Sequence, residues 1–86
     1  MYEVILMGQA ERFYAAAQRP LARKLARCFE HLEQDPRRHS NAKPLTGPLA
    51  GYHRFRVGDY RVVYRIDEPA RKVLVVKIAH RREVYQ

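Results

Sequence analysis

The tight turn predicted at Gly58-Asp59 constrains the fold of this chain more than any other feature. On both sides of it, in residues 52–57 and 60–67, polar and apolar side chains alternate with a period of two, which is typical of β-strands. A glycine in the first position of a two-residue loop favours a hairpin turn. The sequence therefore predicts two antiparallel strands joined by this turn.

With Val57 opposite Tyr60, this hairpin has one apolar face and one basic face. The apolar face must contact the core, and it carries Phe55, Val57, Tyr60, Val62 and Tyr64. The other face carries Tyr52, Arg54, Arg56, Arg61, Val63 and Arg65. Across the ladder we expect Arg56 opposite Arg61, Arg54 opposite Val63, and Tyr52 opposite Arg65.

The basic face indicates an anionic ligand. Arginines that face each other across a sheet repel by about 1 kcal/mol for a close exposed pair. The chain has 17 Lys and Arg residues against 9 Asp and Glu residues, a formal net charge of +8. Composition favours a nucleic acid and leaves an acidic partner protein open. A solvated charged face without a ligand is the third interpretation.

The first half of the chain predicts a strand followed by a helical hairpin. Tyr2–Leu6 is rich in strand-forming residues, and the segment QAERFYAAAQ has the apolar spacing of a helix. A second helix is expected to begin near Pro20 and to end at Asp35 and Pro36. Its apolar stripe consists of Leu21, Leu25, Cys28, Phe29 and Leu32.

The second half predicts a connector and three strands. The polar connector contains a brief extended piece around Lys43–Leu45, and the last strand, Val73–Ile78, is apolar on both faces in its first half, as in an interior strand. The expected order is β-α-α-β-β-β. We therefore predict one α+β domain over residues 1–86, with the helices packed on one face of a small, mainly antiparallel sheet.

Composition excludes several classes of function. Cys28 is the single cysteine, which excludes an internal disulfide or a cysteine-based metal site and favours a reducing cytoplasm. The four histidines lack metal-ligand spacing, and the four glycines form no phosphate-binding loop. No signal peptide and no apolar run of membrane-spanning length is evident. We expect a cytoplasmic protein with no cofactor and no membrane contact.

A basic face with nearby tyrosines suits passive phosphate binding or metal-free RNA cleavage, in which a ribose 2′-hydroxyl attacks the adjacent phosphate. Arginine stabilises charge on phosphoryl oxygens, but it holds its proton too tightly to act as a base. His80 and Tyr85 are better proton carriers, although His80 can equally be a surface residue at a strand end. Tyr52 can stack on a base, and Arg81 is expected on the same side of the sheet as Lys77.

The run KPLTGPLAGYHRFRVGDYRVVYRID, followed by VLVVKIAHRREVY, resembles the RelE/ParE superfamily of toxins from type II toxin-antitoxin systems, and its RelE branch above all. The resemblance covers Lys43 to Tyr85. It implies a small α/β fold and a metal-independent endoribonuclease that cleaves mRNA in the ribosomal A site. It also implies an acidic, RelB-like antitoxin that neutralises the toxin by covering its basic face, and whose complex binds operator DNA.

The resemblance also implies roles for individual residues. Arg61 and Arg81 match family arginines that bind and stabilise the scissile phosphate, and Tyr85 matches a tyrosine that orients the nucleophile or stacks on the substrate. Arg54 and Arg56 match a basic strand segment that often carries lysines, one of which is proposed as the general base; because arginine at position 54 is a poor base, His80 is the substitute. Candidates for RNA or phosphate binding are Lys43, Tyr52, Arg54, Arg56, Arg65 and Lys77. Several relatives continue into a C-terminal helix, which we do not expect here.

Two alternatives to RNA cleavage remain open. A ParE-like toxin would inhibit DNA gyrase without nuclease chemistry, and the other alternative is a nontoxic remnant or a regulatory binding module. ParE-type relatives tend to lack the full set of basic residues and tyrosine. The combination of Arg61, Arg81 and Tyr85 therefore favours RNA cleavage.

Overall fold

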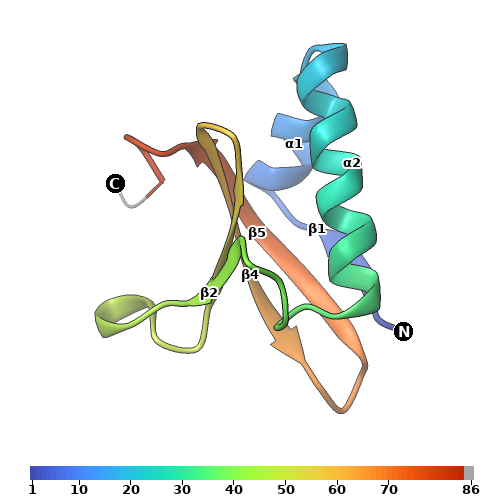
Figure 1. Cartoon of the computed structure of the whole chain (residues 1–86), viewed down its shortest axis with the longest axis vertical. Coiled ribbons are helices and arrows are strands. Elements are labelled where there is room, and N and C mark those ends of the chain that lie inside the picture. Colours follow the sequence, from blue (N-terminus) through green and yellow to red (C-terminus); the bar gives the residue numbers. More distant parts are fainter. Residues whose placement is uncertain (85–86) are drawn as a thin grey trace.

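The computed structural model describes residues 1–84 of the chain (Figure 1). Its elements are β1 (Glu3–Leu6), α1 (Gln9–Ala16), α2 (Arg19–Gln34), β2 (Ala42–Pro44), the short 3-10 helix η1 (Gly47–Leu49), β3 (His53–Val57), β4 (Tyr60–Asp67) and β5 (Lys72–His80). The strands form one five-stranded sheet with the order β1-β5-β4-β3-β2. β1 runs parallel to β5, and the other three pairings are antiparallel.

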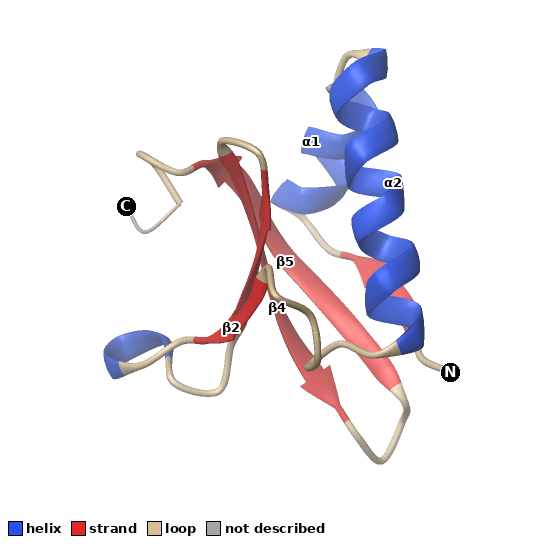
Figure 2. Cartoon of the chain, viewed as in Figure 1, coloured by secondary structure: helices blue, strands red, loops and turns tan. Residues whose placement is uncertain are grey.

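The helices α1 and α2 lie on one side of this sheet, as Figure 2 shows. The segment between β2 and β3 and the C-terminal segment lie on the other side, which we call the open face. The predicted α+β class, the helical hairpin and the mainly antiparallel sheet are therefore confirmed. The extended piece predicted around Lys43 is β2, which pairs with β3 at the edge of the sheet.

The core forms where α2 meets the sheet. Pro20 stands in the first turn of α2, where the missing backbone N–H costs nothing. From the predicted apolar stripe, Leu25, Cys28 and Leu32 are buried completely or almost so. Burial raises the pKa of the Cys28 thiol to about 12, so this cysteine is a packing residue and not a nucleophile. Within residues 1–84, no helix has the length and apolar character needed to span a membrane.

The predicted register of the β3–β4 hairpin is confirmed. Val57 pairs with Tyr60, Arg56 with Arg61, and Arg54 with Val63. The prediction of a Tyr52–Arg65 pair is wrong, because the ladder ends at His53 opposite Tyr64. The Tyr52 N–H donates instead to the Leu49 carbonyl (3.0 Å), and the Tyr52 carbonyl accepts from the Leu45 N–H (2.9 Å).

β5 is longer and less regular than the sequence predicts. It reaches His80, and its register against β4 shifts between Val63 and Tyr64, where a bulge adds Val76. β1 pairs only with the first part of β5. Beyond the end of β1, the side-chain amide of Gln9 supplies the hydrogen bonds that a neighbouring strand would make. Its Nε2 donates to the Ile78 carbonyl (2.6 Å), and its Oε1 accepts from the Ile78 N–H (2.8 Å).

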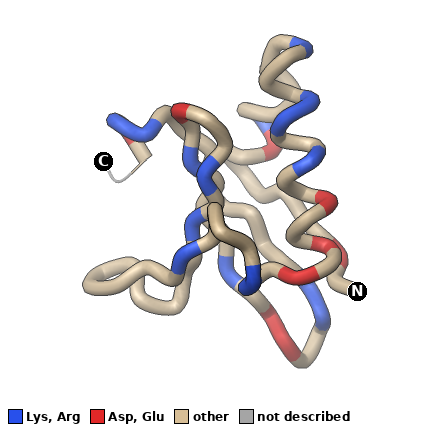
Figure 3. Tube along the Cα trace, in the orientation of Figure 1, with Lys and Arg blue, Asp and Glu red and all other residues tan. Residues whose placement is uncertain are grey.

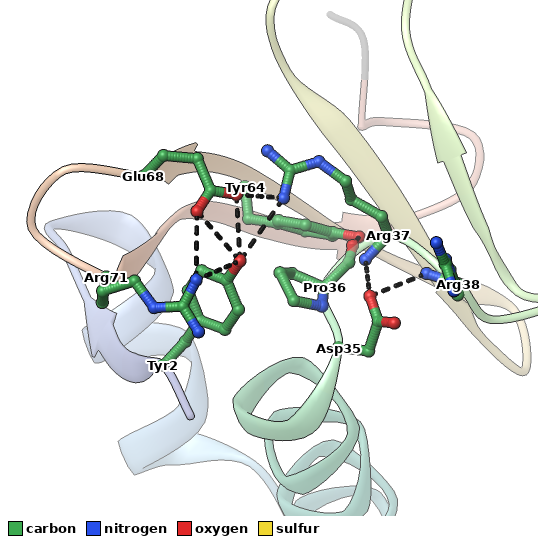
Figure 4. Close-up of polar contacts among 8 residues, drawn as sticks. All are labelled: Tyr2, Asp35, Pro36, Arg37, Arg38, Tyr64, Glu68 and Arg71. Atoms are coloured by element: carbon green, nitrogen blue, oxygen red, sulfur yellow. Dashed lines mark hydrogen bonds and ion pairs between the residues drawn. The ribbon is translucent and has the colours of Figure 1, made fainter.

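A polar cluster joins the N-terminus, the end of α2 and the β4–β5 turn (Figure 4). The Tyr2 hydroxyl donates to the Glu68 carboxylate (2.9 Å), which also forms ion pairs with Arg37 and Arg71. The Arg71 guanidinium lies 4.2 Å from the centre of the Tyr2 ring. These contacts, first the Tyr2 hydrogen bond and then that of Arg37, lower the pKa of Glu68. Because the groups are exposed, we expect a modest effect on stability.

Candidate functional site

One cross-strand row on the open face holds three of the predicted cations. Lys43 pairs with Arg54, Arg54 with Val63, and Val63 with Lys77. Residues directly opposite each other in a ladder point to the same face, so this central row crosses four strands. Neighbouring strands lie about 4.8 Å apart, and the central row is therefore roughly 14 Å long.

A second row lies beside the hairpin turn. Arg56 is opposite Arg61, and Arg61 is opposite Ala79. The Arg81 N–H donates to the Asp59 carbonyl (2.8 Å), which anchors the residues after β5 at the turn beside Arg61. The structure therefore brings Arg56, Arg61 and Arg81 to one end of the open face. Arg65 is exposed on the same face, opposite Leu74 and further from the turn.

Backbone carbonyls position two of these arginines. The Arg54 guanidinium donates to the Asn41 carbonyl (2.8 Å), and that of Arg61 donates to the carbonyls of Gly58 (3.1 Å) and Tyr60 (2.9 Å). These acceptors are neutral carbonyls, and both guanidinium groups keep their positive charge. The two side chains are thus held in defined orientations.

Charges are distributed unevenly along the chain. Within residues 1–84, Glu68 at the β4–β5 turn forms ion pairs with Arg37 and Arg71. Figure 3 shows basic positions on the strands, the C-terminal segment and α2, and acidic positions near the N-terminus, at both strand turns and in the C-terminal segment. The predicted arginine patch is therefore present as a strongly basic surface.

The open face also carries a small second core that the sequence did not reveal. Val63, Ala79 and Val84 are buried there, and Leu45, Tyr52 and Val76 pack against them. The segment 45–52 and the C-terminal segment lie on this side of the sheet (Figure 1) and supply Leu45, Tyr52 and Val84 to this second core. Between them lies a groove of about 700 Å³. The sequence signal for this second core was the presence of Leu45 and Tyr52 within and just after the polar connector.

His80 lies on the other side of the sheet. It pairs with Tyr60, and its ring contacts the Tyr60 ring at 5.5 Å between centroids, on the side of the helices. The His80 Nδ1 accepts from the Arg82 N–H (3.2 Å). The structure therefore does not bring His80 to the arginines of the open face. Tyr85, the other predicted proton carrier, lies outside the described residues.

The assembled side chains suit phosphate more than a metal ion. Within the described part of the chain, no three His, Cys, Asp or Glu residues lie close enough to hold a metal. Arg54, Arg56 and Arg61 can instead donate hydrogen bonds to phosphoryl oxygens in a planar, bidentate geometry. This arrangement can bind a polyanion and can stabilise negative charge that develops on it.

His53 is a half-buried titratable group on the helix side of the sheet. Its ring stacks on Tyr64 with centroids 5.5 Å apart. Its Nδ1 is buried without a hydrogen-bond partner among residues 1–84. Burial, and secondarily the charge of Arg37, lowers the pKa of His53. The folded state therefore disfavours the protonated imidazole.

We expect the protein to lose stability as the pH falls below about 6.5, the ordinary pKa of histidine. In this range the unfolded state binds a proton at His53 that the folded state does not, so acid favours unfolding. Melting temperatures measured from pH 7 to pH 5 should fall, and the slope should be shallower in His53→Gln. Asp35 and Glu68, whose pKa values are lowered, affect stability only at lower pH. An unchanged slope in His53→Gln would contradict this assignment.

Comparison with known proteins places this architecture in a family. The family model described as the ParE toxin of the type II toxin-antitoxin system parDE matches residues 5–85. The chain belongs to the RelE/ParE superfamily of toxins. It is a type II toxin-antitoxin toxin of the RelE type, and the predicted resemblance is confirmed.

Relatives in Mycobacterium tuberculosis support this assignment. The chain is 46% identical to Toxin RelE over 48 residues, which cover 56% of this chain and half of that protein. It is 37% identical to Toxin RelG over 68 residues, which cover 79% of this chain and 76% of RelG. The crystal structure of the RelBE2 toxin-antitoxin complex superimposes with a TM-score of 0.71 at 31% identity, covering 92% of this chain and 96% of that one.

Proposed function

We propose that this RelE-type chain is a metal-independent endoribonuclease that cleaves mRNA on the ribosome and thereby inhibits translation. The observation that supports the proposal best is the pair of basic rows on the open face. Arg56 and Arg61 oppose each other directly, and Arg81 is anchored beside them. A phosphodiester bound there would relieve their mutual repulsion.

The reaction requires little beyond charge stabilisation and two proton transfers. The 2′-oxygen of a ribose attacks the adjacent phosphorus, a 2′,3′-cyclic phosphate forms, and the bond to the 5′-oxygen breaks. One proton leaves the 2′-hydroxyl, and another reaches the departing 5′-oxygen. We propose that Arg61 and Arg81 stabilise the charge on the phosphoryl oxygens, while Arg54, with Lys43 and Lys77 in the central row, holds neighbouring phosphates.

The choice of a proton carrier for this reaction depends on the position of each candidate side chain and on its chemistry. Arg54 is fixed by the Asn41 carbonyl and holds its own proton too tightly to serve as a base. His80 is on the helix side of the sheet. We therefore propose that Tyr85, at the end of the C-terminal segment, orients the nucleophile or assists the proton transfer, as the family resemblance implies.

An antitoxin is the proposed protein partner. The crystal structure of RelBE2 is that of a toxin-antitoxin complex. The basic open face of this chain suits an acidic antitoxin that covers the two basic rows. Operator DNA would be bound by that complex and not by the toxin alone.

The test is induction of the toxin in growing bacteria, with mRNA 5′ ends mapped genome-wide and plasmid supercoiling measured in the same cultures. We expect new 5′-hydroxyl ends within translated regions at positions that follow the reading frame. If mRNA stays intact after induction of the toxin, the proposal is contradicted.

A second candidate function comes from the family model, which is named for ParE. A ParE-like chain would inhibit DNA gyrase, so the induced cells would lose supercoiling while mRNA stayed intact. The same experiment therefore separates the two functions.

A further inference from the structure

The groove on the open face is lined mainly by apolar side chains. Two of them, Val63 of β4 and Val76 of β5, come from the sheet, and we call them the floor. Three others come from the segment before β3, and we call them the wall: Thr46, Leu49 and Tyr52. The bulge in β5 places Val76 and then Lys77 in succession along the groove, because it interrupts the alternation of the strand. At about 700 Å³ the groove falls within the usual size of ligand sites, roughly 300 to 1,000 Å³.

The groove shares two residues with the central row. Val63, which lies between Arg54 and Lys77 in that row, is also part of the groove floor, and Lys77 borders the groove. A nucleic-acid strand whose phosphates contact the central row therefore has its bases within reach of the groove. An apolar, aromatic-walled hollow next to cations is the arrangement by which single strands are bound, with bases stacked and phosphates paired.

Charge favours RNA over a second copy of the same chain as the occupant. Two copies with a formal charge of +8 each would repel. A free apolar molecule would make no use of Lys77 or of Arg54. A nucleotide contacts both the apolar groove and the cations of the central row, because its base is flat and apolar on its faces and its phosphate is anionic.

We propose that this groove is a nucleobase-binding subsite, in which one base of the RNA stacks on Tyr52 and contacts the apolar floor. Thr46 is the polar side chain in the wall, and its hydroxyl can donate or accept a hydrogen bond at the edge of the base. The subsite selects the nucleotide that is presented to the arginines. This inference rests on the proposed function, since it concerns the substrate of the same face.

The test measures binding and does not require cleavage. Short RNAs with 2′-O-methyl groups cannot be cut by 2′-hydroxyl attack, and one base at a time is replaced by an abasic site. We expect removal of one particular base to weaken binding of the purified wild-type chain about tenfold, as is usual for the loss of a stacked base. In Tyr52→Leu this difference should disappear, whereas Tyr52→Phe, which keeps the ring, should retain it.

Leu49→Ala and Thr46→Val serve as second variants if Tyr52→Leu does not fold, which its melting temperature reports. Leu49→Ala should reduce the dependence on that base, and Thr46→Val should change which base is preferred there. Binding that follows only the number of phosphates would overturn the proposal. So would variants that bind RNA normally but escape neutralisation by a co-expressed antitoxin, because the groove would then be an antitoxin site.

The experiment also separates this inference from the proposed function. If the wild-type chain binds with base dependence but cuts no mRNA in cells, the nuclease proposal fails and the subsite stands. If it cuts mRNA while Tyr52→Leu and wild type show the same base dependence in binding, the nuclease proposal stands and the subsite fails.

Discussion

Arg61→Ala is expected to lower the rate of mRNA cleavage by about 100-fold or more, the usual loss when one preorganised donor to a developing oxyanion is removed. Arg61 lies opposite Arg56 and beside the anchored Arg81, and its guanidinium is oriented by the carbonyls of Gly58 and Tyr60. Its replacement removes both a charge and a planar donor. The rate is measured by primer extension on a reporter mRNA in a purified translation system.

Three control variants make this result specific. Arg61→Lys keeps the charge and loses the planar fork, so activity should be partly restored. Arg23→Ala removes the same charge from the exposed surface of α2, on the helix side, and should cleave like wild type. His80→Ala, also on the helix side, should retain activity as well. Undiminished cleavage by a folded Arg61→Ala variant would show that the site is assigned wrongly.

Tyr64→Ala is expected to lower the free energy of unfolding by about 3–5 kcal/mol, the range for removal of a large buried aromatic ring. Tyr64 is completely buried, and its hydroxyl donates to the Pro36 carbonyl at 2.7 Å. Burial also raises the pKa of Tyr64, so the hydroxyl stays neutral. A small domain has roughly 5–15 kcal/mol of stability in total, and Tyr64→Ala should be largely unfolded at 37 °C. Urea unfolding followed by circular dichroism measures the loss.

Tyr64→Phe separates the hydrogen bond from the packing. This variant keeps the ring and leaves the Pro36 carbonyl without its buried donor, which should cost about 1–3 kcal/mol. If Tyr64→Phe is as unstable as Tyr64→Ala, the hydrogen bond to the loop after α2 dominates. If both variants match wild type, the core is organised differently from this structure.

Much of the hairpin could be predicted because its information is local. A two-residue turn sets the register, and a period of two then assigns each side chain to a face, so the pairs Arg56–Arg61 and Arg54–Val63 follow from the sequence. The same reasoning places Tyr64 in the core. It fails for Tyr52, where the turn of η1 takes the backbone N–H before the strand begins.

The position of His80 could not be predicted in this way. The expected strand ended at Ile78, but β4 offers Tyr60 and Arg61 as further partners, so β5 continues to His80. Pairing with Tyr60 then turns the imidazole toward the helices. The bulge before Lys77 could not be predicted either. A bulge is recognised in a sequence by a break in the alternation of polar and apolar residues, and the residues before Lys77 are apolar on both faces of the strand.

The sequence by itself determined the α+β class, the helical hairpin, the hairpin register and the basic face, because each depends on periodicity or on a nearby turn. Only the tertiary structure decided which groups from outside the hairpin join that face. The groove forms only when β5 and the segment 45–52, which contains Tyr52, come together from distant parts of the chain. Such contacts depend on how loops fold over the sheet, and no local pattern of side chains encodes them.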